Sequence, residues 1–218
     1  MSAHVERGTR ERILEVAESS LGEHGYHGTR LHQIAQQVGI QKASLFHYFS
    51  SKEHLYRAVI EEAFGETEQV IRCVLESEAA AMEKVRGLVD AYVEMVAAHP
   101  ERTKILLRQS LGDAPSSQEQ PPELRRLMDV VAAFITEGQR AQVFAAIDPT
   151  ALVLSVIGMV AFFFTSGPVV APEWFDGGGR EARIARIKRH VLTMVQRSLG
   201  CCDCVGGVRK GHHKEEVK

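Results

Sequence analysis

Apolar residues recur at intervals of three or four positions along most of this chain, and no stretch alternates apolar and polar residues as a strand does. The first example lies between residues 9 and 24, where one side of a helix would carry Ile13, Leu14, Ala17 and Leu21. The pattern therefore predicts an all-α protein with about nine helices.

Residues that commonly end helices divide the first part of the chain. Gly25 ends the first predicted helix, and Thr29 can cap a short helix over residues 30–38. Gly39 stops that helix, because glycine tolerates a left-handed backbone. A third short helix is expected over residues 42–49.

A long helix is expected next. Ser50 and Glu53 are spaced as a capping box, so a helix should follow them and run to about residue 75. The later predicted helices, bounded by prolines, glycines and polar loops, cover residues 79–98, 101–111, 122–144, 149–166 and 180–199.

The helix at 149–166 is unusually apolar. Its dense apolar part runs from residue 151 to residue 164, which is short for a membrane span and typical of a buried helix. A helix that is apolar on every side must be covered on every side. We expect the subunit core and a dimer partner to cover it in an intermolecular four-helix bundle, whereas a central helix of a monomer is the alternative. The stripe of the last helix that we expect at the dimer interface includes Ile184, Ile187, Val191 and Met194.

Residues 31–49 have the spacing of a helix–turn–helix unit. Ala35 is small where two helices must cross closely, and Gly39 lies in the turn. Three residues are apolar where the unit must pack on the first helix: Ile34, Val38 and Leu45. This geometry places the second helix of such a unit in the major groove of DNA.

Four consecutive ring side chains, FHYF, occupy positions 46 to 49 of this unit. One buried helix face cannot hold all four, so some of them must face solvent. We expect Phe49 to join the core, and His47 with parts of Phe46 and Tyr48 to point outward.

Charge is distributed unevenly around the unit. Asp and Glu are absent from residues 24–52, although the chain has 28 of them and a net charge of −2. A surface that faces phosphates would exclude carboxylates, because like charges repel. The local pattern therefore supports DNA binding, whereas the total charge excludes a basic protein that wraps nucleic acid or binds membranes through basic residues.

Position within the unit suggests different roles for its residues. Three of them begin its second helix and are best placed to reach base edges: Gln41, Lys42 and Ser44. The ring of His47 and the phenol of Tyr48 can bond phosphate oxygens. Lys52, in the first turn of the next helix, can hold a phosphate together with the helix N-terminus. The alternative is that all of these are ordinary surface residues of a small helical unit.

The stretches TRERILEVA and GYHGTRLHQIAQQVGIQKASLFHYFSSKEHLY resemble the TetR family of bacterial transcriptional regulators over residues 9–60. The resemblance implies that the residues contacting a double-stranded DNA operator are Thr29, Arg30, Lys42, Ala43, Ser44, Phe46, His47, Tyr48 and Lys52, and the position of Gln41 at the start of the second helix adds it to these candidates. Two positions depart from the family pattern. Phe46 stands where tyrosine is usual and lacks its hydroxyl, and Gln41 replaces a common serine that would cap the helix.

The resemblance also implies a division into domains. We expect a DNA-binding domain over residues 7–67, with the motif at 30–49, and a helical ligand-binding and dimerisation domain over residues 68–200. Residues 201–218 are expected to be a disordered tail. The tail contains residues that could bind a metal or sense oxidants, although their spacing fits no standard zinc site: Cys201, Cys202, Cys204, His212 and His213.

A small-molecule inducer follows from the same resemblance. We select the candidate ligand contacts from aromatic, methionine and charged residues of the second domain: Met95, Arg108, Phe134, Phe163 and Trp174. Each hydrophobic one alone is more typical of a core than of a ligand contact, and Arg108 could instead reach solvent. Their mixture suggests a mostly apolar organic molecule.

These observations predict a cytoplasmic, homodimeric repressor that a small molecule releases from DNA. We find no nucleophile elbow, phosphate-binding loop or HExxH pair, and so expect no enzyme activity, cofactor or metal site. The charged N-terminal sequence lacks the pattern of a signal peptide, and four cysteines in so long a chain fit a reducing compartment. One alternative is a metal or redox sensor that uses the tail. Another is a DNA-binding activator or architectural protein without a ligand, which a completely filled core would favour.

Overall fold

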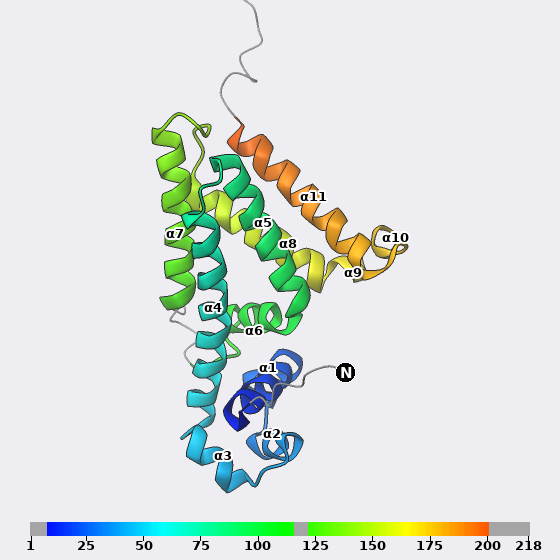
Figure 1. Cartoon of the computed structure of the whole chain (residues 1–218). Helices are drawn as coiled ribbons and strands as arrows, with labels where there is room; N and C mark the ends of the chain where they lie inside the picture. Colours follow the sequence, from blue (N-terminus) through cyan, green and yellow to red (C-terminus); the bar gives the residue numbers. More distant parts are fainter. Residues whose placement is uncertain (1–7, 116–121, 201–218) are drawn as a thin grey trace, which may run out of the picture.

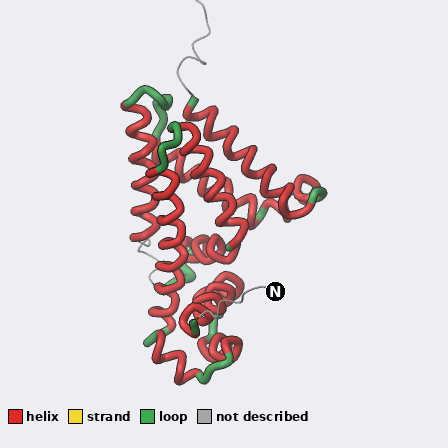
Figure 2. The backbone as a smooth tube through the Cα atoms, viewed as in Figure 1, coloured by secondary structure: helices red, strands yellow, loops and turns green. Residues whose placement is uncertain are grey.

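The computed structural model describes residues 8–115 and 122–200. Every regular element within these residues is an α-helix, as Figures 1 and 2 show, which confirms the predicted all-α class. The described part of the chain has eleven helices rather than about nine, because two short helices follow the apolar one. The predicted tail at 201–218 lies outside the described residues.

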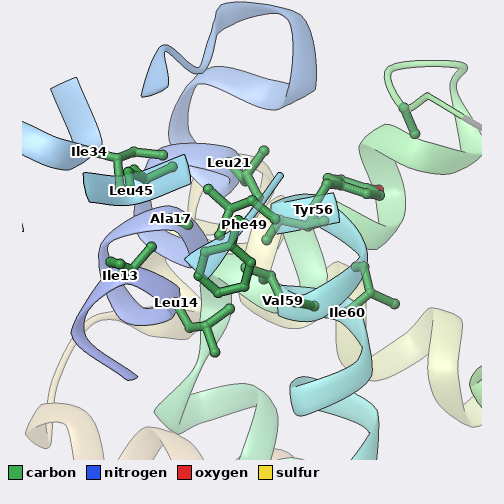
Figure 3. Packing of buried hydrophobic residues seen from close by; sticks show 14 of the residues in the cluster. Ile13, Leu14, Ala17, Leu21, Ile34, Leu45, Phe49, Tyr56, Val59 and Ile60 are labelled. Atoms are coloured by element: carbon green, nitrogen blue, oxygen red, sulfur yellow. The ribbon is translucent and has the colours of Figure 1, made fainter. Parts of the chain in front are cut away.

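The N-terminal helices surround one core at one end of the molecule (Figure 1). They are α1 (Thr9–Gly28), α2 (Leu31–Val38), α3 (Lys42–Tyr48) and the first half of α4 (Lys52–Glu76). Figure 3 shows how Leu21 of α1, Leu45 of α3 and Val59 of α4 meet in this core. Each of these side chains is almost completely buried, so the packing fixes α3 relative to α1 and α4.

The remaining helices form a bundle around a second core. They are α5 (Ala81–Ala98), α6 (Pro100–Ser110), α7 (Pro122–Arg140), α8 (Pro149–Thr165), α9 (Gly167–Val170), α10 (Pro172–Phe175) and α11 (Gly179–Leu199). Helix α6 lies at the end of this bundle that faces α1, and its Ile105 belongs to the first core (Figure 1). The second half of α4 packs against α5 and α7. The boundary predicted between residues 67 and 68 therefore falls inside one continuous helix.

Thr29 ends α1 instead of capping α2, so the predicted cap is wrong. The backbone leaves the helical region at Gly25, where φ is 72°. The Thr29 hydroxyl donates a hydrogen bond to the Gly25 carbonyl at 2.7 Å, and the Thr29 residue is only 3% exposed. Arg30 stands at the N-cap of α2 without a side-chain capping bond.

The cap of α4 lies one residue later than predicted. The Ser51 hydroxyl accepts a hydrogen bond from the His54 N–H at 3.0 Å, and the Ser50 N–H donates to Nδ1 of His54 at 3.2 Å. Glu53 instead pairs with Arg57 one turn along α4, at 2.6 Å. Two neighbouring serines allow either register, and only the course of the backbone selects Ser51.

Helix α8 is apolar on all sides, but one subunit covers only part of it. Val160 is fully buried, whereas Leu154 and Phe162 are each 53% exposed. Among the described residues, no helix combines the length and hydropathy that crossing a membrane requires. The exposed side of α8 is therefore a surface that a single subunit leaves apolar.

Candidate DNA-binding surface and ligand cavity

A tight turn at Gly39 joins α2 to α3. Its φ of 80° and ψ of 30° lie in the left-handed region, which glycine adopts at little cost. The Gly39 N–H donates to the Gln36 carbonyl at 3.1 Å, and the Ile40 N–H donates to the Ala35 carbonyl at 2.9 Å. Ala35 is 1% exposed, so its small side chain sits in the packed interior of the unit. This arrangement is a helix–turn–helix unit with α3 as its second helix.

Helix α3 presents rings and polar groups to solvent. Phe49 is 1% exposed, whereas Phe46 and Tyr48 are 43% and 42% exposed, and His47 is also exposed. The prediction that only Phe49 joins the core is confirmed. The predicted DNA contacts that are exposed are Arg30, Gln41, Lys42, Ala43, Phe46, His47 and Tyr48, and those that are half-buried are Ser44 and Lys52.

Two of the predicted DNA contacts have intramolecular partners. Thr29 is buried and bonded to Gly25, so its side chain lies away from this surface. The Lys52 ammonium lies 3.4 Å from the His27 carbonyl and 4.6 Å from the centre of the Tyr26 ring. Burial lowers the pKa of Lys52, and the charge of Asp113 opposes this shift. Lys52 thus joins the start of α4 to the end of α1.

An apolar cavity of about 170 Å³, partly open to solvent, lies within the second bundle. Helices α4, α5, α7 and α8 form most of its wall, with Phe64, Met95, Phe134 and Val156 among the lining residues. The wall includes only two side-chain hydroxyls, those of Thr67 and Tyr92. A cavity lined in this way accepts an apolar molecule, because the transfer of apolar surface out of water is favourable.

A second pocket, of about 390 Å³, adjoins this cavity and shares Thr67, Tyr92 and Met95 with it. Its rim includes two acidic side chains that are well exposed, Glu66 and Glu94. The second pocket therefore connects the region of Tyr92 to solvent.

Arg102 of α6 borders this open pocket and also holds two other helices. Its guanidinium lies 2.9 Å from the Glu18 carboxylate of α1 and 2.7 Å from the Glu66 carboxylate of α4. Burial acts to lower the pKa of Arg102, but hydrogen bonds and charges from Glu66 and Glu18 outweigh it and raise the pKa. His99 Nδ1 lies 3.5 Å from the same Glu18 carboxylate. Arg102 and His99 at the pocket rim therefore contact α1, the helix against which the helix–turn–helix unit packs.

Comparison with known proteins gives two matches to family models. The model of the bacterial regulatory proteins of the tetR family matches residues 13–59, and that of the tetracyclin repressor-like C-terminal domain matches residues 78–199. The second match alone covers more than half of the 218 residues.

The chain belongs to the TetR family.

Individual relatives agree with this assignment. The HTH-type transcriptional regulator RutR of Escherichia coli (strain K12) is 26% identical over 162 residues, which cover 74% of this chain and 76% of RutR. Two solved structures show the same fold. AibR in complex with isovaleryl coenzyme A and operator DNA has a TM-score of 0.66 at 21% identity, covering 86% of this chain and 97% of AibR. The ketosteroid transcriptional regulator KstR2 of Mycobacterium tuberculosis has a TM-score of 0.66 at 20% identity, covering 86% of this chain and 95% of KstR2. This TetR-family chain is therefore a DNA-binding transcriptional regulator.

Only some of the ligand contacts predicted for this TetR-family protein lie at the cavity. Met95 and Phe134 line it, whereas Arg108 donates to the Glu23 carbonyl at 3.0 Å in the contact between α6 and α1. Phe163 and Trp174 stack on each other, with ring centres 5.2 Å apart, near the junction of α8 and α10. Arg108, Phe163 and Trp174 thus serve packing between helices and do not line the cavity.

The predicted dimer residues also separate into two groups. Ile187 and Val191 are fully buried within their own subunit, because α11 turns them toward α5 and α8. Met194 is 44% exposed, and Ile184 is half-buried. Ile187 and Val191 are therefore core residues of the subunit, and only Met194 and part of Ile184 remain available to a partner.

Sequence reasoning missed Tyr92, Thr67 and Arg102. Tyr92 carries a polar atom within an otherwise apolar helix face, a signal that we overlooked in favour of phenylalanine and tryptophan. Arg102 looks like an ordinary surface charge in the sequence, because its partners lie far away along the chain.

Proposed function

We propose that this protein is a TetR-family repressor that acts as a homodimer, binds a double-stranded DNA operator through α3 of each subunit, and is released by a mostly apolar organic molecule. The observation that carries the proposal is the apolar cavity, because α4 forms part of its wall and begins directly after α3. The cavity also argues against a regulator without a ligand, for which a filled core is expected.

Release of the operator would follow from a change in the distance between the two α3 helices of the dimer. The two α3 helices of a dimer must lie about 34–36 Å apart, or a multiple of this distance, to enter successive major grooves. A ligand that binds better to another arrangement of α4 shifts the population away from the spacing that fits DNA. Arg102 supports this coupling, since it borders the open pocket and pairs with Glu18 of α1.

The DNA contacts in this proposal come from the exposed residues of the motif. Gln41, Lys42 and Ser44 would reach base edges, because they lie at the start of α3. His47, Tyr48 and Lys52 would hold the sugar–phosphate backbone.

The dimer in this proposal uses the apolar surface that α8 leaves uncovered. Exposed apolar surface of this kind marks protein–protein contacts. The large apolar residues exposed on α8, α9 and α11 are Leu154, Phe162, Val169, Val170 and Met194.

The relation between cavity and release can be tested with a cavity-filling variant. The operator is first identified by sequencing the genomic fragments that the protein retains, and inducers are found by screening apolar organic compounds for release of that operator. Val131→Phe adds bulk to the cavity wall, so it should keep operator affinity and lose the response to the inducers. Val143→Phe is the control, because Val143 is exposed and lines none of the cavities described above. An unchanged response of Val131→Phe would place the inducer site elsewhere.

A further inference from the structure

The phenol ring of Tyr92 lies at the junction of two adjoining pockets. Tyr92 lines both the apolar cavity and the second pocket, so its ring lies where the two meet. Burial raises the pKa of Tyr92, which keeps its hydroxyl neutral and able to donate. Among the described residues, this hydroxyl has no hydrogen-bond partner. The other hydroxyl at this junction is already used, because Thr67 donates to the Ala63 carbonyl at 2.9 Å.

Tyr92 is half-buried, and its oxygen is not among the fully buried side-chain atoms that lack a partner, so the hydroxyl is within reach of water. Apart from the hydroxyls of Thr67 and Tyr92, the cavity beside Tyr92 is lined by hydrocarbon and sulfur groups. An acceptor on a bound ligand would take the place of that water as the partner of the hydroxyl. The position of Tyr92 requires that acceptor to lie at the junction, with the apolar part of the ligand on one side of it.

The volume of the apolar cavity limits the size of that apolar part. The cavity of about 170 Å³ is slightly larger than an engineered apolar cavity of about 150 Å³ that binds benzene. An apolar group of roughly six to eight carbons would therefore fill it. Any larger part of the ligand must extend into the open pocket of about 390 Å³.

The charges around the junction select a neutral acceptor. Arg102 is already paired with Glu18 and Glu66, and Glu94 is paired with Lys188 at 2.6 Å. A carboxylate beside Tyr92 would lose its water and gain no free cation, which is unfavourable.

We propose that the ligand is a neutral carbonyl compound, whose apolar group fills the apolar cavity and whose carbonyl oxygen accepts a hydrogen bond from the Tyr92 hydroxyl. This inference rests on the proposed function, because it assigns the polar contact of the same cavity. A free ketone or ester and a thioester of a larger carrier share this chemistry, and they differ in what enters the open pocket.

The test compares matched compounds on matched variants by calorimetric titration. The probes are 1-cyclohexylethanone and ethylcyclohexane, which differ by the carbonyl oxygen. Tyr92→Phe should weaken binding of the ketone about fivefold and change binding of the hydrocarbon less than twofold, since one net hydrogen bond is lost. Tyr56→Phe is the control, because Tyr56 lines none of the cavities described and donates to Gln109 at 3.2 Å. It should leave both affinities unchanged.

Two further probes define the ligand class. Cyclohexanecarboxylate at neutral pH should bind at least about tenfold more weakly than the ketone, because its charge must be desolvated. The pantetheine thioester of the same acid should bind more tightly than the ketone if the ligand is carried by a larger group, and more weakly if it is a free small carbonyl compound. Tightest binding of the carboxylate would overturn the proposal.

The possible failures can be told apart. Equal weakening of ketone and hydrocarbon by Tyr92→Phe would mean that Tyr92 only fills space, which overturns this inference and leaves the ligand cavity intact. Absence of binding by every probe to the wild-type protein would overturn both this inference and the cavity as an inducer site. If Tyr92→Phe does not fold, a ketone labelled with ¹³C at the carbonyl is bound to the wild-type protein. A downfield shift relative to the ketone in hexane supports the hydrogen bond, and an unchanged resonance contradicts it.

Discussion

Phe49 turns into the core because α3 stops just before it. In a continuous helix, Phe46 and Phe49 would share a face, since residues three apart are neighbours. Helix α3 ends at Tyr48, and Phe49 has an extended backbone with φ of −135°. Its ring then packs at the edge of the His54 ring, with centres 5.6 Å apart, and leaves Phe46 outside. A single change of backbone conformation thus decides which rings are free to meet DNA.

Lys52 can serve DNA binding, internal packing or both, and salt dependence separates these roles. If Lys52 neutralises one phosphate per subunit, Lys52→Ala should reduce the slope of log affinity against log salt by about 1.8 for a dimer. The affinity is measured by fluorescence anisotropy with operator DNA between low and moderate salt.

The control for this prediction is Lys84→Ala. Lys84 donates to the Leu75 carbonyl at 2.7 Å, far from α3 along the chain, and its loss should leave the slope unchanged. An unchanged slope for Lys52→Ala, with a lower melting temperature, would show that Lys52 only joins α4 to α1.

Base reading and backbone binding are predicted to come from different residues of α3. Gln41→Ala should relax preference at one base pair of each half-site, because one good side-chain pairing discriminates by about 1–3 kcal/mol. His47→Ala should lower affinity without changing preference, because a backbone contact carries no sequence information. Selection from a randomised operator library measures both effects. The assignment is wrong if His47→Ala changes the selected sequence and Gln41→Ala does not.

Helices α1 and α6 make the most extensive contact between two helices of the described residues, and α6 lies between α1 and the rest of the bundle (Figure 1). Gly22 permits this approach. A Cβ at Gly22 would lie 2.7 Å from Cβ of Glu101 and 3.0 Å from its Cα, so neighbouring backbone would have to move. The ion pair of Arg102 with Glu18 crosses the same contact.

Gly22→Ala should therefore destabilise the protein by about 1–3 kcal/mol, the usual cost of forcing extra volume into packed structure. Gly65→Ala is the matched control, because a Cβ at Gly65 in α4 meets nothing within 4 Å. That change should stabilise the protein by about 0.5–1 kcal/mol, since alanine loses less chain entropy in a helix. Urea unfolding followed by circular dichroism measures both. Equal stability of the two variants would contradict a close α1–α6 contact.

At the scale of the whole molecule, one face of the bundle exposes apolar side chains that a single subunit does not cover. Leu154 and Phe162 of α8 are half-exposed, while Ile187 of α11 faces inward. We expect a second subunit to cover this face, as homodimers are typical of the TetR family.

Phe162→Asp should convert the dimer into monomers at micromolar concentration, because an unpaired charge in a desolvated interface costs several kcal/mol. Light scattering measures the mass. Val70→Asp is the control, since Val70 is 48% exposed on α4, and it should leave the dimer intact. Ile187→Asp should instead unfold the subunit, because Ile187 lies in its core. A dimeric Phe162→Asp protein of wild-type stability would place the interface elsewhere.

The amino-acid sequence by itself determined the features that depend on neighbours along the chain. Helical periodicity involves residues three and four apart, so the all-α class and most helix positions could be read directly. The motif at 31–49 depends on Ala35, Gly39 and Leu45 within one short segment, and the structure has these residues in the predicted turn and core.

Only the tertiary structure decided the features that depend on distant segments. Tertiary packing sets the backbone conformation at the helix ends. That conformation makes Ser51 rather than Ser50 the cap of α4, and it places Thr29 at the end of α1 rather than at the start of α2. The direction of Ile187 follows from contacts of α11 with α5 and α8. The same holds for the cavity at Tyr92, whose walls come from helices spread over more than half of the chain. An apolar stripe in a sequence predicts that this side of the helix is buried, because burial of apolar surface is favourable. The hydrophobic effect is not directional, so the stripe does not predict whether the same subunit or a second one covers it.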